Sequence, residues 1–123
     1  MIKNQLDFPL LEEFKKRFLV TEETIFAYNG NIYSDKYLPN DIIVHEEEHL
    51  RQQEEYGLNE WVDGYLNDDK FRLKMEIKAY RKQIDYIKDR NQKHLTRLKC
   101  SEALSSGLYG YVLTPSEAYE RLK

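Results

Sequence analysis

The chain has 123 residues, of which 41% are hydrophobic, so we expect one domain spanning residues 1–123 with a modest core. Its 19 basic and 22 acidic residues give a formal net charge of −3 and are interspersed without a long basic block, so we expect no nucleic-acid partner. No apolar run approaches the roughly 18 residues of a membrane span, and the N-terminus lacks a signal-peptide core, so we expect no membrane association and a cytoplasmic location. Cys100 is the only cysteine, which excludes a disulfide within the chain.

The first third of the chain predicts mixed secondary structure. Apolar residues at three- and four-residue steps follow Pro9 and predict an amphipathic helix to about residue 19. Two β-prone runs, 24–28 and 31–34, flank Asn29-Gly30, a dipeptide typical of a type I′ turn. These runs predict a small hairpin.

The rest of the chain predicts helices almost to its end. The expected helical segments are 42–56, a short one around 61–65, 69–89, one around 95–104 and a last one after 114. Gly57 is suited to end the first of them, and Thr114 with Glu117 forms the pattern of a capping box before the last. The predicted fold class is therefore α+β and mostly helical, with the N-terminal hairpin packed against the 42–56 helix.

A metal-binding pattern lies within the 42–56 helix. His45-Glu46-Glu47-Glu48-His49 matches His-Glu-x-x-His, and residues four apart project from the same face of a helix. Two such imidazoles suit a zinc ion, while Glu46 can act as general base on a water that the metal acidifies. The alternative is a charged, solvated helix that contains two histidines by chance, and the scarcity of histidine argues against it.

The third ligand that a catalytic zinc site needs is predicted at Glu76. This carboxylate lies in the apolar stripe of the 69–89 helix, beside Ala79, where an unpaired charge would be costly. Its alternative partner is Arg72, one turn earlier on the same face. Because His45 and His49 supply a cation site, we favour metal binding by Glu76.

Together these residues resemble the signature of gluzincin metallopeptidases, which are thermolysin-like in the general sense. The resemblance narrows to small metallopeptidases encoded in phages and prophages, and it covers about residues 40 to 90 and the 109–119 tail. It is carried by Val44-His45-Glu46, His49, Gln52-Gln53, Asp69, Phe71-Arg72 and Glu76-x-x-Ala79-Tyr80. It implies a minimal zincin-like domain with zinc bound by His45, His49 and Glu76.

The resemblance also raises the question of supporting groups. Tyr80 stands where thermolysin-like enzymes commonly place an acidic residue that orients a zinc histidine, and its hydroxyl could accept that imidazole proton. Gln52 and Gln53 could orient ligands or cap nearby backbone. A gluzincin also needs a donor to the developing oxyanion, for which the candidates are Tyr109 and Tyr111, then Tyr80 and His94.

The function expected from these residues is a zinc-dependent peptidase acting on a peptide or protein, in which Glu46 activates the attacking water. Extended substrate would pair with an edge of the hairpin. One alternative is a non-catalytic, zinc-stabilised binding or assembly module of a mobile element. Another is a regulatory, repressor-cleaving protease, although the segment after Glu76 lacks the Leu-Leu-Met-Pro type of ending associated with that group. Two imidazoles and a carboxylate would also suit non-haem iron, but the adjacent base favours zinc.

Overall fold

Helices dominate the computed structural model, which describes residues 1–123, and a small three-stranded sheet lies near the N-terminus. The expected α+β class is therefore confirmed. In chain order the elements are β1 (Ile2–Lys3), η1 (Gln5–Asp7), α1 (Leu11–Arg17), β2 (Phe26–Tyr28), β3 (Asn31–Tyr33), α2 (Asn40–Tyr56), α3 (Leu58–Asn67), α4 (Asp69–Tyr86), α5 (Arg90–Leu104), η2 (Gly107–Tyr109) and α6 (Pro115–Arg121), where η denotes a 3₁₀ turn. None of the helices combines the length and the apolar character that crossing a membrane requires.

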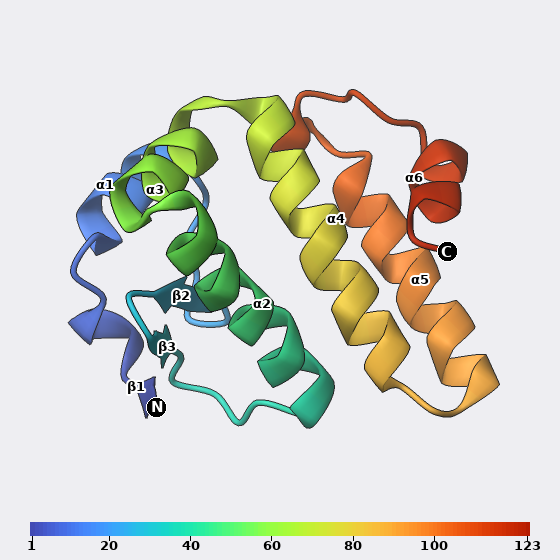
Figure 1. Ribbon diagram of the computed structural model, residues 1–123, viewed down its shortest axis with the longest axis horizontal. Helices are drawn as coiled ribbons and strands as arrows, with labels where there is room; N and C mark the ends of the chain where they lie inside the picture. Colours follow the sequence, from blue (N-terminus) through green and yellow to red (C-terminus); the bar gives the residue numbers. More distant parts are fainter.

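The sheet and the longer helices lie side by side across the molecule. Figure 1 shows α2 between the sheet and α4, with α5 on the far side of α4 and α6 against α5. The short helices α1 and α3 lie together at one end, and the α4–α5 connection lies at the opposite end. Helix α2 therefore has a neighbour on each side, and its residues facing the sheet and α4 are buried.

The hairpin forms as the sequence predicts. Strands β2 and β3 pair antiparallel, and Asn29 and Gly30 both have positive φ, at 49° and 85°, as a type I′ turn requires. Strand β1 adds a parallel partner to β3, which the sequence analysis did not predict. Two residues are too short for a readable alternation of polar and apolar side chains, so this pairing leaves no local signal.

The helices begin and end close to the residues predicted from the capping signals, with small shifts. Gly57 ends α2 with φ at 95°, and the capping box of Thr114 and Glu117 begins α6. The long helix α4 ends at Tyr86, before the predicted residue 89. Helix α5 starts earlier than its apolar pattern indicates because the Asp89 side chain accepts a hydrogen bond from the backbone N–H of Gln92.

Two apolar clusters lie on either side of a polar layer. One joins α4, α5, η2 and α6, and the other joins the N-terminal aromatic residues to the hairpin, with α3 packed against it. Between them, the buried residues of α2 are all polar or charged: His45, Glu46, Glu48, His49, Gln52 and Gln53. Because burying such groups without partners is costly, this layer has to satisfy its own hydrogen bonds and charges.

Candidate metal centre

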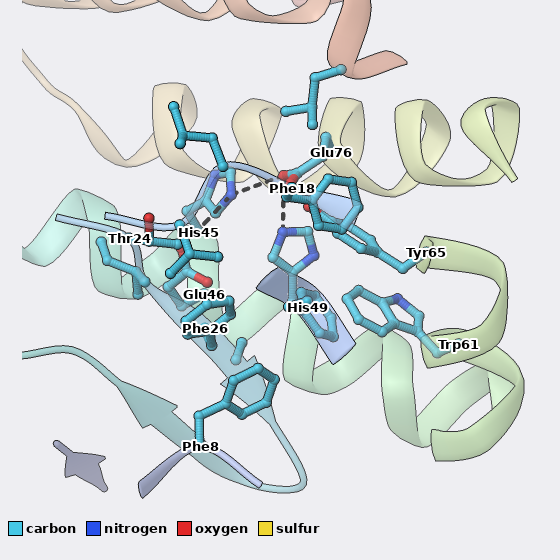
Figure 2. Close-up of a pocket in the computed structure, with 16 residues that line it drawn as sticks. Phe8, Phe18, Thr24, Phe26, His45, Glu46, His49, Trp61, Tyr65 and Glu76 are labelled. Atoms are coloured by element: carbon cyan, nitrogen blue, oxygen red, sulfur yellow. Dashed lines mark hydrogen bonds and ion pairs between the residues drawn. The ribbon is translucent and has the colours of Figure 1, made fainter. Parts of the chain in front are cut away.

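Three side chains from two helices converge in the polar layer. His45 and His49 lie one turn apart on α2, and their Nε2 atoms are 3.1 Å and 2.9 Å from Oε1 of Glu76 on α4. Figure 2 shows both rings directed at this carboxylate. Each residue is buried, and their ligand atoms all lie within 4.8 Å of one another. The group predicted from sequence is therefore brought together, and it could hold a metal ion.

His49 and Glu76 each favour the charged form of the other. Burial alone would lower the pKa of His49, but the negative charge of Glu76 and its hydrogen bond raise that pKa to about 9. Burial alone would raise the pKa of Glu76, but the two histidines hold it well below its usual range. The site is therefore built around a carboxylate that stays ionised and needs positive charge beside it.

Gln52 fixes which nitrogen of His49 faces Glu76. The amide oxygen of Gln52 accepts from the indole N–H of Trp61 at 3.1 Å, and its nitrogen donates to the carbonyl oxygen of Met75 at 3.1 Å. Because Trp61 can only donate and a carbonyl can only accept, the amide has one possible orientation. His49 Nδ1, 3.0 Å from the same amide oxygen, must therefore carry a proton. In a neutral ring, Nε2 is left with its lone pair directed at the ligand group.

Gln53 has a different role from its neighbour. Its side-chain nitrogen donates to the carbonyl oxygen of Ala27 at 2.7 Å, and its oxygen accepts from the backbone N–H of Asn29 at 3.0 Å. The two options left open for the glutamines are thus both realised. Gln52 orients His49, and Gln53 ties the hairpin to α2.

His45 lacks the support that Gln52 gives His49. Its Nδ1 atom is buried and has no hydrogen-bond partner. The Tyr80 ring packs beside the imidazole, with centroids 4.6 Å apart, but its hydroxyl does not accept the imidazole proton. The expectation of a Tyr80 acceptor was therefore wrong, because this side chain meets the ring of His45 rather than its nitrogen.

Tyr65 is the supporting residue that the sequence analysis missed. Its hydroxyl donates to Oε2 of Glu76 at 2.5 Å, which leaves Oε1 for the histidines. Burial and the charge of Glu76 raise the pKa of Tyr65 well above its usual value, so it stays a donor. The only sequence signal was its place one turn after Trp61 in α3, and that spacing does not show that α3 folds over α4.

Arg72 is not the partner of Glu76. Its guanidinium bonds to Asp69 and to the carbonyl oxygens of Tyr65 and Leu108. The alternative in which an internal Glu–Arg pair explains the buried carboxylate is thereby excluded. Arg72 instead fixes the end of α3 and the loop after α5 to α4.

Glu46 lies beside the ligand group without joining it. Its Oε2 is 4.0 Å from His45 Nε2, and the side chain is buried. Burial raises the pKa of Glu46, the two histidines counteract this effect, and Glu76 adds to it. A carboxyl with a raised pKa next to a possible metal site suits a group that takes up and releases a proton.

The centre lies against an apolar pocket of about 310 Å³. Figure 2 shows aromatic side chains around the ligand group. The lining residues are Phe8, Phe14, Phe18, Leu19, Val20, Thr24, Ile25, Phe26, Ala27, His45, Glu46, His49, Trp61, Tyr65, Glu76 and Leu108. The wall therefore comes from the N-terminal segment, the hairpin, α3 and the loop after α5.

The structure does not bring the other catalytic candidates to this pocket. Tyr109 is buried in the apolar cluster between α4 and α6, and Tyr111 is 78% exposed. His94 is exposed on α5, where its Nδ1 bonds to the hydroxyl of Tyr119. Tyr65 is the only tyrosine that lines the pocket. The assignment of Tyr109 and Tyr111 as oxyanion donors gains no support from this placement.

Comparisons of the chain with protein families, curated proteins and solved structures return no match. Functional inference therefore rests on the geometry of the centre.

Proposed function

We propose that the chain is a zinc-dependent peptidase of the gluzincin type, with His45, His49 and Glu76 as metal ligands. The observation that carries the proposal is the convergence of both imidazole Nε2 atoms on Oε1 of Glu76, with Glu46 adjacent. Two imidazoles and a carboxylate from a His-Glu-x-x-His helix and a second helix suit zinc. The carboxyl of Glu46 beside the ligands favours zinc over non-haem iron, which has no need of a base at that position.

The residues around the centre divide the work of hydrolysis. A zinc ion held here would polarise a peptide carbonyl and acidify an attacking water. Glu46 takes the proton of that water and passes it to the leaving amine, a role that its raised pKa favours. Gln52 and Tyr65 hold His49 and Glu76 in their ligating orientations.

The number of ligands favours catalysis over a purely structural zinc site. Only three side chains belong to the group, whereas structural zinc sites are usually closed by four protein ligands. A fourth position would remain for water and substrate, next to the apolar pocket. This observation supports the enzyme rather than a zinc-stabilised assembly module.

Substrate pairing with the hairpin would be confined to the segment that leads into β2. Strand β1 covers one edge of β3, and Gln53 occupies the carbonyl of Ala27 and the N–H of Asn29. The pocket is lined by Thr24 and Ile25, which precede β2. Because the Thr24 carbonyl already accepts from the Gln5 side chain, an extended substrate would reach the metal along residues 25–26 rather than along the whole hairpin.

Glu46→Gln tests the proposal, with Glu47→Gln as its matched control. Glu47 is the next residue on α2 and is exposed, so the control makes the same change of charge outside the centre. Zinc-loaded wild-type protein and both variants are incubated with a peptide library, and cleavage is followed by mass spectrometry. We expect all three proteins to retain zinc. Only Glu46→Gln should lose hydrolysis, with a cleavage rate lower by a factor on the order of 10² or more. Cleavage by Glu46→Gln at the wild-type rate would contradict the role of the base.

A further inference from the structure

Basic residues are concentrated in one part of the chain, the helices α4 and α5. Residues 69–104, which form α4 and α5, contain eleven basic and five acidic residues, whereas the rest of the chain contains eight basic and 17 acidic residues. The α4–α5 pair is therefore net positive on an otherwise acidic protein. Such a separation orients a protein toward an anionic partner even when its total charge is negative.

Part of this positive charge lines a surface groove at the α4–α5 connection. The groove is formed by Lys88, Arg90, Asn91, Lys93, His94 and Arg97, none of which is apolar. In Figure 1 this connection lies at the end of the molecule remote from α1 and α3. The groove shares no lining residue with the pocket at the metal centre.

The cations of the groove are not neutralised within the protein. Lys88, Arg90, Lys93 and Arg97 make no ion pair with any carboxylate. The nearest acidic residue in sequence, Asp89, is engaged as the cap of α5. Arg97 rests over the ring of Tyr119 at 5.2 Å, and its Nε is buried without a hydrogen-bond partner. Four positive side chains thus line the groove without a carboxylate partner, and Arg97 is partly held by the Tyr119 ring.

We propose that this groove binds the phosphodiester backbone of a nucleic acid. Arg90, Lys93 and Arg97 follow one another at three- and four-residue steps on α5, so they form a stripe of about 10 Å on one face. That length spans about three phosphates at roughly 3.4 Å per nucleotide along one strand. Asn91 and His94 add polar groups of the kind that contact phosphate and sugar.

The lining favours a nucleic acid over an acidic protein segment. Protein partners usually bury apolar or aromatic anchors at the centre of an interface, and this groove offers none. Backbone contacts to phosphate need only cations and hydrogen-bond donors. The expectation of no nucleic-acid partner came from the absence of a long basic block in sequence. The groove is built from the single stretch 88–97, whose basic residues are separated by polar ones in sequence but line one groove on the helix surface.

Fluorescence anisotropy with a labelled 20-base-pair DNA duplex, and in parallel an RNA duplex of the same length, tests this proposal. The groove variant is Lys88→Gln, Arg90→Gln and Lys93→Gln together. The control is Lys3→Gln, Lys15→Gln and Lys16→Gln, which removes the same charge from exposed, unpaired positions in the N-terminal part of the chain. Circular dichroism verifies that both variants are folded.

At about 50 mM salt we expect the wild type to bind at least one of the duplexes, with log affinity falling against log salt at a slope of about −3 to −4. The groove variant should lose at least about tenfold in affinity and most of that slope, and the control should stay within about threefold of wild type. The ratio of the two affinities then identifies the nucleic acid. The proposal is overturned if neither duplex binds, if both variants lose affinity equally, or if polyglutamate of matched charge binds where the duplexes do not.

Discussion

Replacing Gln52 with Met should weaken zinc binding although Gln52 is not a ligand. The change keeps a long, unbranched side chain but removes the acceptor of His49 Nδ1–H and Trp61 Nε1–H and the donor to the Met75 carbonyl. Without that acceptor, either His49 nitrogen can carry the proton and the ring is free to turn. Loss of such a ligand-orienting partner typically costs about 10- to 100-fold in metal affinity.

The same substitution should also cost stability. Gln52 is fully buried, and its loss leaves two buried donors, His49 Nδ1–H and Trp61 Nε1–H, without an acceptor. The Met75 carbonyl lies inside α4 and keeps its helical hydrogen bond. At about 1–3 kcal/mol for each donor, we expect a loss of about 2–6 kcal/mol in the free energy of unfolding of the metal-free protein. This loss is a large part of the roughly 5–15 kcal/mol of stability typical of a domain, so a variant that disturbs the same hydrogen bonds less is needed beside it. Trp61→Phe serves this purpose, because it removes one of these bonds and keeps the acceptor of His49.

Gln53→Met is the matched control. Gln53 is also buried and bonded to backbone, but its partners are Ala27 and Asn29 of the hairpin and not a ligand. Zinc affinity is measured by competition with a chromophoric chelator, and stability by chemical denaturation with the metal removed. We expect both glutamine variants to lose stability, whereas only Gln52→Met loses zinc affinity and Trp61→Phe binds zinc as the wild type does. Wild-type zinc affinity in Gln52→Met would refute the reasoning.

Three further predictions concern the same centre. Because the pKa of His49 is raised to about 9, zinc must displace a proton at neutral pH, so affinity should rise about tenfold per unit between pH 7 and 8.5; a flat profile in chelator competition would contradict this pairing. In the metal-free protein the raised pKa of His49 adds stability that is complete below about pH 6.5 and lost toward pH 9. The lowered pKa of Glu76 adds stability that is complete above about pH 4.5 and lost in acid. The free energy of unfolding, measured by denaturation in EDTA, should therefore be greatest between about pH 5 and 6.5. Tyr65→Phe removes the hydrogen bond to Glu76 and should lower zinc affinity about tenfold, whereas Tyr56→Phe on α2, which has no contact with the ligands, should leave it unchanged.

The three residues of the possible metal site could be predicted because each belongs to a local sequence pattern. His45 and His49 are four residues apart on a predicted helix, and Glu76 interrupts an apolar stripe. Each of these patterns can be recognised from the periodicity of a single helix. The structure adds that the two helices meet at these residues, which periodicity alone does not establish.

The supporting residues were harder to predict because they depend on how elements pack. The bond from Tyr65 to Glu76 requires α3 to fold over α4, and the parallel pairing of β1 with β3 joins segments about 30 residues apart. Tyr109, named above as an oxyanion candidate, lies in a stretch with glycines on both sides. The 3₁₀ turn η2 instead carries its ring into the apolar cluster against α4.

Metal content tests the central claim most directly. Wild type, His45→Ala and Glu76→Ala are purified without added metal, and bound metals are counted by inductively coupled plasma mass spectrometry before and after zinc titration. If zinc is the metal, as proposed, we expect about one zinc per wild-type chain and loss of that zinc in both variants, since each removes one of the three converging atoms. A wild-type chain that stays free of metal even after titration would contradict the metal centre and, with it, the proposed peptidase.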